Sequence, residues 1–354
     1  MQQEWVRQLL AWYKENARPL PWRDTPDPYR VWVSEVMLQQ TRIEAVRPYF
    51  DHFMQELPTI RALAQVPTER LMKLWEGLGY YSRARNLQAA ARQLMDRYDG
   101  EMPASYEELL ALPGIGEYTA GAVASIAFGI PVPAVDGNVL RVMARLLCCD
   151  RDVMQPVVRK ELTGILRTMV PADAPGQFNQ ALMELGETIC LPRTEPHCDA
   201  CPIQSYCEAS ARHCARELPV RAKPKERRIE KRTVLLLIRA AAEGRQVLVR
   251  KRPPKGLLAG LWELPNAEGW YTQQNMEERI RQYGLSLQSL SALQEAKHVF
   301  SHIEWHMQGW CVQVSGDTPE TAGKWVDSRE LAEEIALPSA FRAYSALLPV
   351  LLQE

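Results

Sequence analysis

Residues 106–139 read YEELLALPGIGEYTAGAVASIAFGIPVPAVDGNV, and they give the strongest indication of fold in the first part of the chain. Two apolar runs with helical spacing flank the turn Leu112-Pro113-Gly114-Ile115-Gly116. Two glycines at a helix start let the backbone approach an anion closely, with free N–H groups and the helix dipole directed at it. The turn is therefore typical of a site for one phosphate group, and an ordinary connection between two helices explains it equally well.

A carboxylate follows about twenty residues later, in Val135-Asp136-Gly137-Asn138-Val139. Asp136 precedes the helical pattern NVLRVMARLL, and an Asp at that position predicts an N-cap. The same anionic side chain, beside the turn, could also stabilise a positively charged sugar. The two roles are compatible.

Helical spacing extends from residue 2 to about residue 207, and strand signals are nearly absent there. The composition then becomes rich in Lys, Arg and Pro, as in an exposed linker. Beyond it, TVLLLIRA, QVLVRKR and HVFSHIEWHMQGWCVQV carry β-branched and aromatic residues, with AAEGR as a hairpin turn, before helical segments near the end. We expect an all-α domain at 1–216, a basic linker at 217–231 and an α+β domain at 232–354.

The bulk composition is that of an ordinary soluble protein with two cores, at 354 residues, 46% hydrophobic and 24% charged. The net charge of −1 means that any affinity for nucleic acid must come from local patches. Residues 212–232 form one such patch, since they hold three Glu and nine basic residues: Arg212, Arg216, Arg221, Lys223, Lys225, Arg227, Arg228, Lys231 and Arg232.

The first residues, MQQEWVRQLLAWYKENARPLPW, predict an amphipathic helix and neither a signal peptide nor a membrane span. We therefore expect an intracellular protein, in which eight Cys are more suited to metal binding than to disulfides.

Four cysteines, Cys190, Cys198, Cys201 and Cys207, have the spacing C-x7-C-x2-C-x5-C. Zinc ribbons usually carry two C-x2-C pairs, and only one is present, so a [4Fe–4S] cluster is favoured over zinc or four incidental buried thiols. Four further cysteines lie outside this spacing and are interpreted as structural: Cys148, Cys149, Cys214 and Cys311.

A single carboxylate, Glu35, interrupts the apolar and amide-rich run VSEVMLQQT at residues 33–41. Taken alone, a helical Glu is more often solvated than functional.

Its surroundings change that interpretation. SEVMLQQT, preceded by LPWR and followed by GLGYY at residues 77–81, closely resembles the MutY family of helix–hairpin–helix DNA glycosylases, and the similarity continues through the turn, the VDGNV segment and the cysteines. In the related endonuclease III type the first cysteine gap has six residues, and here it has seven.

The resemblance implies that the chain hydrolyses the N-glycosidic bond of adenine mispaired with 8-oxoguanine, or with guanine, and leaves an abasic site. It assigns Glu35 as the general acid and Asp136 as the ionised carboxylate that stabilises an oxocarbenium-like transition state. An apolar pocket would keep Glu35 protonated. Both a covalent Asp136 adduct and a free cation are compatible with the sequence.

Tyr118 occupies the position at which lyase members of the superfamily have a Lys. Because a Tyr cannot form a Schiff base, the resemblance implies a monofunctional glycosylase. It also implies that Tyr118 and Asn138 assist by hydrogen bonding around Asp136, whereas packing and helix-start satisfaction are their structural alternatives.

A base inside a duplex must be extruded before it can react. By resemblance, Gly114 and Gly116 hold the DNA backbone, and Tyr80 and Gln40 are inserted near the opposing base. The resemblance also places seven residues in or beside the adenine pocket: Arg18, Leu20, Trp22, Arg23, Leu38, Ile43 and Gln180.

The last domain resembles a Nudix-like lesion-recognition domain, on the segments GLLAGLWELP and His298-Val299-Phe300-Ser301-His302. The Gly/Glu box of a working Nudix hydrolase is missing, and only Glu277-Glu278 remain as a carboxylate pair. We therefore expect a binding domain in which His298 and Ser301 bond to 8-oxoguanine and Phe300 supports them.

The expected partner is double-stranded DNA with 8-oxoguanine:adenine or G:A mispairs, bound by a cytoplasmic, nucleoid-associated monomer. Three rival functions remain: a glycosylase for another base such as thymine, a non-catalytic lesion-binding protein, and a Nudix nucleotide hydrolase.

Overall fold

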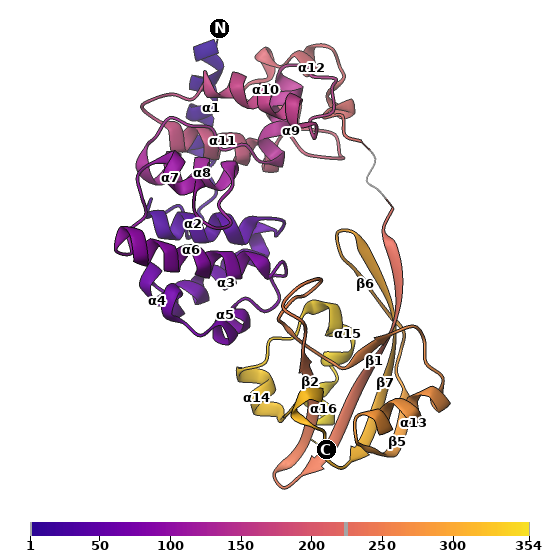
Figure 1. Cartoon of the computed structure of the whole chain (residues 1–354). Helices are drawn as coiled ribbons and strands as arrows, with labels where there is room; N and C mark the ends of the chain where they lie inside the picture. Colours follow the sequence, from indigo (N-terminus) through magenta and orange to yellow (C-terminus); the bar gives the residue numbers. More distant parts are fainter. Residues whose placement is uncertain (1, 223–225, 354) are drawn as a thin grey trace. The chain divides into compact units, whose positions relative to one another are not determined.

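The computed structural model describes residues 2–222 and 226–353, which divide into two compact units (Figure 1). The first unit comprises residues 1–65 and 85–223, and the second comprises residues 66–84 and 224–354. Lys223 and Lys225 of the predicted basic patch lie outside the described residues. No helix in the described part of the chain is long and apolar enough to cross a membrane.

The first unit is helical, and its described residues contain no strand, as the sequence predicted. Its helices are α1 (Gln2–Asn16), α2 (Pro28–Leu38), α3 (Ile43–Glu56), α4 (Ile60–Gln65), α6 (Ser82–Tyr98), α7 (Tyr106–Leu110), α8 (Glu117–Phe128), α9 (Gly137–Leu146), α10 (Pro156–Arg167), α11 (Pro175–Thr188) and α12 (Glu208–Ala211), with α6 beginning in residues assigned to the second unit. Short 3₁₀ turns at Cys198–Ala200, Gln204–Tyr206 and Ala215–Glu217 follow α11 and α12.

Helix α2 is buried along most of its length, including Val31, Trp32, Val33 and Met37. A helix that is apolar on all sides belongs in the interior of a domain. Asp27 caps its start by accepting the Arg30 amide at 2.8 Å. The consequence for function is that the middle of this helix carries a charged residue, Glu35, into the core.

The turn at 111–116 joins α7 to α8 and has the hairpin form that the sequence predicted. Gly114 has φ +74°, and a Cβ on it would lie 2.5 Å from the Cβ of Asn86. Both the left-handed backbone and the close approach of α6 therefore require glycine at this position. Gly116 is the N-cap of α8.

The second unit is built on one sheet in the order β3-β2-β1-β7-β5, with β4 paired to β1, β6 to β7 and β8 to β2. Only β1 and β7 of this path are parallel. The strands are β1 (Arg228–Ala241), β2 (Gly244–Lys251), β3 (Trp262–Glu263), β4 (Asn266–Glu268), β5 (Ser286–Ala292), β6 (Ala296–Val299), β7 (Ile303–Ser315) and β8 (Lys324–Val326). The predicted hairpin turn is present, since Ala241 pairs with Gly244.

Helices cover both faces of this sheet (Figure 1). They are α13 (Gln273–Gln282), α14 (Ser328–Glu333), α15 (Arg342–Ser345) and α16 (Leu348–Leu351), and α5 (Thr68–Leu74) also belongs to this unit. Alternation along β1 sends Leu236 into a core with Phe341 and sends Leu237 into a second core with Ile280. The predicted α+β class is confirmed.

Strand β1 begins at Arg228, inside the range predicted as linker. Arg228 and Ile229 pair with Ile303 and Glu304 of β7. These two residues have no strand-like apolar pattern of their own, so it is the pairing with a distant segment that makes them part of a strand. The linker prediction for 228–231 is therefore wrong.

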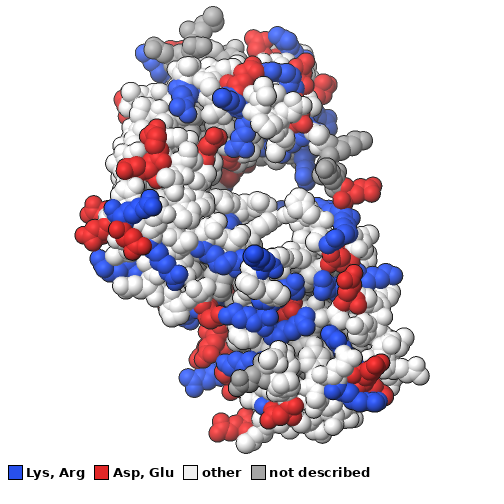
Figure 2. All heavy atoms as spheres, viewed as in Figure 1, with Lys and Arg blue, Asp and Glu red and all other residues white. Residues whose placement is uncertain are grey.

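Charged side chains are mixed over the visible face of both units, with no single continuous basic surface (Figure 2). This distribution agrees with the net charge of −1.

Candidate active site

A cavity of about 720 Å³ opens in the first unit, and every residue that lines it belongs to that unit. Thirteen of the residues predicted from sequence line it together: Leu20, Trp22, Arg23, Glu35, Leu38, Gln40, Ile43, Gly114, Gly116, Tyr118, Asp136, Asn138 and Gln180. Segments from α2, the 111–116 turn, α8, α9 and α11 thus converge on one space. At that size the cavity lies within the range typical of small-molecule sites.

Glu35 lies on α2 and is 6% exposed. The Tyr118 hydroxyl donates a hydrogen bond to its Oε2 and also contacts the Met183 sulfur at 3.4 Å. Burial raises the pKa of Glu35 to about 7, and the Asp136 carboxylate adds to the rise while the Tyr118 bond works against it. A carboxyl group with this pKa can hold a proton at neutral pH, so Glu35 is suited to general acid chemistry.

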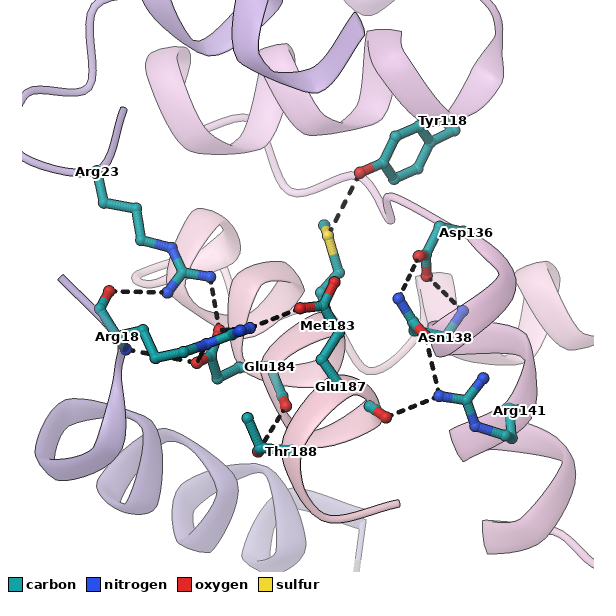
Figure 3. Close-up of polar contacts among 11 residues, drawn as sticks. Arg18, Arg23, Tyr118, Asp136, Asn138, Arg141, Met183, Glu184, Glu187 and Thr188 are labelled. Atoms are coloured by element: carbon teal, nitrogen blue, oxygen red, sulfur yellow. Dashed lines mark hydrogen bonds and ion pairs between the residues drawn. The ribbon is translucent and has the colours of Figure 1, made fainter. Parts of the chain in front are cut away.

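Asp136 is the N-cap of α9, as the sequence predicted. Its Oδ1 accepts the backbone amides of Asn138 at 2.9 Å and Val139 at 2.7 Å, and its Oδ2 accepts the Asn138 side-chain amide at 2.9 Å (Figure 3). Burial raises the pKa of Asp136, while the two backbone amides act to lower it. Three donors therefore hold the carboxylate in one orientation and favour its charged form.

Arg141 extends this network away from the cavity (Figure 3). Its Nη2 donates to Asn138 Oδ1 at 2.9 Å and to the Gly186 carbonyl at 2.7 Å, and its Nε donates to the Cys190 carbonyl at 2.8 Å. The side chain that orients Asp136 is thus itself fixed by a chain of hydrogen bonds that ends at Cys190.

The structure changes the predicted partner of Tyr118. Its hydroxyl bonds to Glu35, whereas hydrogen bonding around Asp136 was expected. The expected bond between Asn138 and Asp136 is present. Tyr118 therefore acts on Glu35, whose pKa burial raises to about 7.

Arg18, which was predicted in or beside the adenine pocket, is not among the residues that line the cavity, but it supports two acidic residues that are (Figure 3). It donates to Glu184 Oε2 at 3.1 Å and to Glu187 Oε2 at 2.6 Å, and Arg23 donates to Glu184 Oε2 at 2.8 Å. Burial works to raise the pKa of Glu184, but the hydrogen bonds from Arg18 and Arg23 outweigh it and lower the pKa. Glu184 is thus a buried, ionised anchor.

Several lining residues were not predicted from the sequence: Gln39, Thr41, Glu117, Thr119, Val135, Gly137, Leu140, Met154, Arg159, Met183, Glu184, Glu187 and Arg221. A signal for two of them existed, because Glu184 and Glu187 follow Gln180 by four and seven positions and so share its helix face. Gln180 itself accepts the Tyr13 hydroxyl at 2.7 Å.

The four predicted metal-ligating cysteines line a second, smaller cavity, together with Arg145 and Ser210. Arg145 donates to the Cys190 sulfur at 3.2 Å. Burial raises the pKa of Cys201 to about 12. Among the described residues, no three His, Cys, Asp or Glu side chains are grouped closely enough to hold a single metal ion.

His298, Phe300 and Ser301 lie in the second unit, in and beside the turn that joins β6 to β7. The ring of Phe300 packs edge-on against His298 at 4.5 Å and against Trp305 at 4.9 Å. Ser301 is exposed, and its Oγ lies 3.5 Å from the hydroxyl of Tyr80. Tyr80 belongs to the same unit as Ser301. None of these residues is among those that line the cavity of the first unit.

Gln40 and Tyr80 share an unusual backbone conformation. Their φ angles are +58° and +46°, in the left-handed region that non-glycine residues rarely adopt. Tyr80 is 46% exposed. Such strained positions are concentrated at functional sites.

Comparison with known proteins gives two family matches. Residues 33–167 match the HhH-GPD superfamily of base excision DNA repair proteins, and residues 233–347 match the NUDIX domain.

Curated proteins similar to the chain over most of its length are named adenine DNA glycosylase. The human protein is 36% identical over 96% of this chain and 74% of its own length. The protein of Buchnera aphidicola subsp. Schizaphis graminum is 30% identical over 93% of this chain and 94% of its own.

Solved structures match the first part of the chain. A thermostable thymine-DNA glycosylase has a TM-score of 0.54 and 28% identity, and covers 60% of this chain and 97% of its own. A trapped endonuclease III–DNA covalent intermediate has a TM-score of 0.51 and 26% identity, and covers 60% of this chain and 98% of its own.

Proposed function

The chain belongs to the adenine DNA glycosylase family, and on that premise we propose that it removes adenine mispaired with 8-oxoguanine, or secondarily with guanine, from double-stranded DNA. The reaction hydrolyses the N-glycosidic bond and leaves an abasic site. The observation that carries the proposal is a pair of carboxylates, the buried Glu35 and the half-buried Asp136, which line one cavity and have different hydrogen-bond partners.

Glu35 supplies the proton. Adenine becomes an adequate leaving group once a ring nitrogen is protonated, so the acid must retain its proton at working pH. The raised pKa of Glu35, about 7, meets this requirement, and its cause is burial. After the bond to C1′ breaks, the sugar carries the positive charge.

Asp136 stabilises that charge. Its Oδ1 and Oδ2 are held by three donors from the first turn of α9, which favours the ionised form. An ionised carboxylate beside an oxocarbenium-like sugar lowers the barrier electrostatically, as in glycoside hydrolysis. Water then adds to C1′, and its excess proton passes to the Glu35 carboxylate, which gave its own proton to the adenine.

Tyr118 supports the assignment as a monofunctional enzyme. A phenol cannot form the Schiff base that β-elimination of the DNA strand requires. Because the Tyr118 hydroxyl is committed to Glu35, its role is to position and tune the acid.

The four cysteines around the second cavity support a [4Fe–4S] cluster. All four thiols line one shared cavity, around which each thiolate would bind a different iron of the cluster. When bound, the cluster would supply the positive charge that turns these buried thiols into thiolates.

Metal analysis of the purified chain tests this assignment. Roughly four irons per chain are expected, with a strong reduction in Cys201→Ser and none in Cys311→Ser, whose thiol lies in β7. Stoichiometric zinc in place of iron would overturn the cluster.

DNA recognition is proposed for two further groups. Gly114 and Gly116 present a helix start with free N–H groups, which suits a backbone phosphate. The turn after β6, with Ser301 exposed and His298 packed on Phe300, offers hydrogen-bonding groups for the base opposite adenine. Tyr80 and Gln40 are proposed to lie near that base once the adenine is extruded.

Single-turnover excision assays test the proposal, with duplexes that pair adenine with 8-oxoguanine, guanine or cytosine, and a G:T mismatch. The expected order of base release is 8-oxoguanine:adenine first and G:A second. Preferential release of thymine would overturn the choice of substrate.

The variant Glu35→Gln separates catalysis from binding. It should bind the 8-oxoguanine:adenine duplex as the parent does while losing base release by roughly 10²–10⁴-fold. Unchanged release would remove Glu35 from the mechanism. Magnesium-dependent hydrolysis of oxidised nucleoside triphosphates by the parent would instead favour the alternative function, a Nudix nucleotide hydrolase.

A further inference from the structure

Two cysteines outside the four-cysteine cavity lie in direct contact. The Sγ atoms of Cys148 and Cys214 are 3.4 Å apart, and the two residues are 66 positions apart in sequence. Both side chains are half-buried, so a small reagent can reach them. A disulfide has an S–S distance of about 2.05 Å, so each sulfur would have to move by less than about 1 Å to form one.

The backbone at this contact is unusual. Cys148 follows Leu147, the C-cap of α9, and has φ +50°. Helices that end in this conformation usually carry Gly there, because a side chain is disfavoured in the left-handed region. Cys214 follows His213, which has φ +56° after the last turn of α12. A cysteine held where glycine would fit better points to a role for its side chain.

The contact between Cys148 and Cys214 joins two segments that are each connected to a predicted functional site. Helix α9 begins directly after Asp136, and the segment before Cys214 contains the four cysteines of the smaller cavity. Around the two thiols lies a small apolar group of Ala209, Ala215 and Leu218. Arg145 of α9 also donates to the Leu218 carbonyl at 3.0 Å, which is a second link between α9 and this segment.

We propose that Cys148 and Cys214 form a reversible disulfide by exchange with a low-molecular-weight disulfide such as oxidised glutathione. One cysteine thiolate attacks the reagent, which forms a mixed disulfide and releases one glutathione thiolate. The second cysteine thiolate then displaces the other. The two cysteines lose two electrons and two protons in all, and the two glutathione molecules take them up.

The bond staples the C-terminal end of α9 to the chain beyond Cys207. It encloses all four cysteines of the smaller cavity in one closed loop, and so restricts the unfolded chain as a long-loop disulfide does. This inference does not rest on the proposed excision of adenine.

Peptide mapping of the full-length chain tests it. The holoprotein is incubated with oxidised glutathione, its free thiols are alkylated, and the digest is analysed by mass spectrometry with and without dithiothreitol. The expected product is a linked pair of peptides containing Cys148 and Cys214, lighter by two hydrogens than the separate thiols and separated by dithiothreitol.

Three variants make the result specific. Cys149→Ser, at the neighbouring thiol, should form the same link, whereas Cys148→Gly and Cys214→Ser should not. Glycine suits the φ of +50°, so Cys148→Gly should fold at least as well as the parent under reducing conditions. A link from Cys149 to Cys214, or a lasting glutathione adduct without ring closure, would overturn the assignment.

Thermal unfolding tests the staple itself. Oxidation should raise the midpoint of the parent and of Cys149→Ser by at least about 5 °C and leave Cys148→Gly unchanged. A bond that forms without raising the midpoint would overturn the stapling role.

Discussion

The Tyr118 hydroxyl donates its hydrogen bond to Glu35, the carboxyl group whose pKa burial raises to about 7, and not to Asp136. This bond favours the carboxylate, so it holds the pKa of Glu35 below the value that burial alone would give. Tyr118 thus sets the pH at which the acid loses its proton.

Tyr118→Phe is therefore expected to raise the pKa of Glu35 further. The alkaline limb of the excision rate, at which Glu35 deprotonates, should move to higher pH by roughly half a unit or more. Single-turnover rates between pH 5 and pH 9 measure this shift. A limb that stays in place, or moves to lower pH, would show that Tyr118 does not tune the acid.

Glu35 also makes stability depend on pH. Its folded pKa of about 7 lies above its ordinary value of 4.5, so the folded state binds more protons between these values. The stability that this gives is fully present below pH 4.5 and is lost as pH rises through 7, amounting to about 3 kcal/mol. Glu35→Gln, which is never charged, should therefore gain stability relative to the parent as pH rises from 5 to 8.

Thermal midpoints of the two proteins across this pH range measure the difference. Glu44→Gln, at an exposed position on α3, is the control and should follow the parent. A constant difference between Glu35→Gln and the parent at every pH would contradict the assignment of the raised pKa.

Glu184 and Glu187 both pair with Arg18, so they allow the stability contributions of a buried and a more exposed ion pair to be compared. Both accept a hydrogen bond from Arg18, but the Glu184 side chain is fully buried and also accepts from Arg23, whereas the Glu187 side chain is 35% exposed. Removing one partner of a buried ion pair costs about 3–5 kcal/mol, and an exposed pair contributes about 0–1 kcal/mol.

We therefore expect Glu184→Gln to destabilise the first unit by about 3 kcal/mol and Glu187→Gln by less than about 1 kcal/mol. Urea unfolding followed by circular dichroism measures both. Equal losses in the two variants would mean that burial of Glu184 does not govern the strength of this network.

Local signals predicted much of this molecule. The 111–116 turn, the N-cap at Asp136 and the hairpin between β1 and β2 each depend on neighbouring residues, and the structure has all three. The burial of Glu35 could not be predicted from its own residue type. It follows from the apolar residues on all sides of its helix.

The wrong predictions concern features that depend on contacts between segments distant in sequence. Tyr118 bonds to Glu35, 83 positions away, and no local pattern distinguishes that partner from Asp136. Arg228 looks like part of a linker, yet pairing with Ile303 of β7 makes it the start of a strand.

At Gly114, a substitution by alanine would cost stability in two ways, through backbone strain and through a clash of the added Cβ, and the two can be measured separately. Gly114 and Gly129 both have positive φ, +74° and +66°, so alanine is strained at either position by about 1–2 kcal/mol. Only at Gly114 would the added Cβ also meet a neighbour, Asn86 at 2.5 Å, whereas nothing lies within 4 Å of it at Gly129. Gly114→Ala should thus destabilise the unit by about 1–3 kcal/mol more than Gly129→Ala. Urea unfolding of the two variants measures the difference, and equal losses would show that α6 can move aside and that the backbone conformation alone requires glycine in this turn.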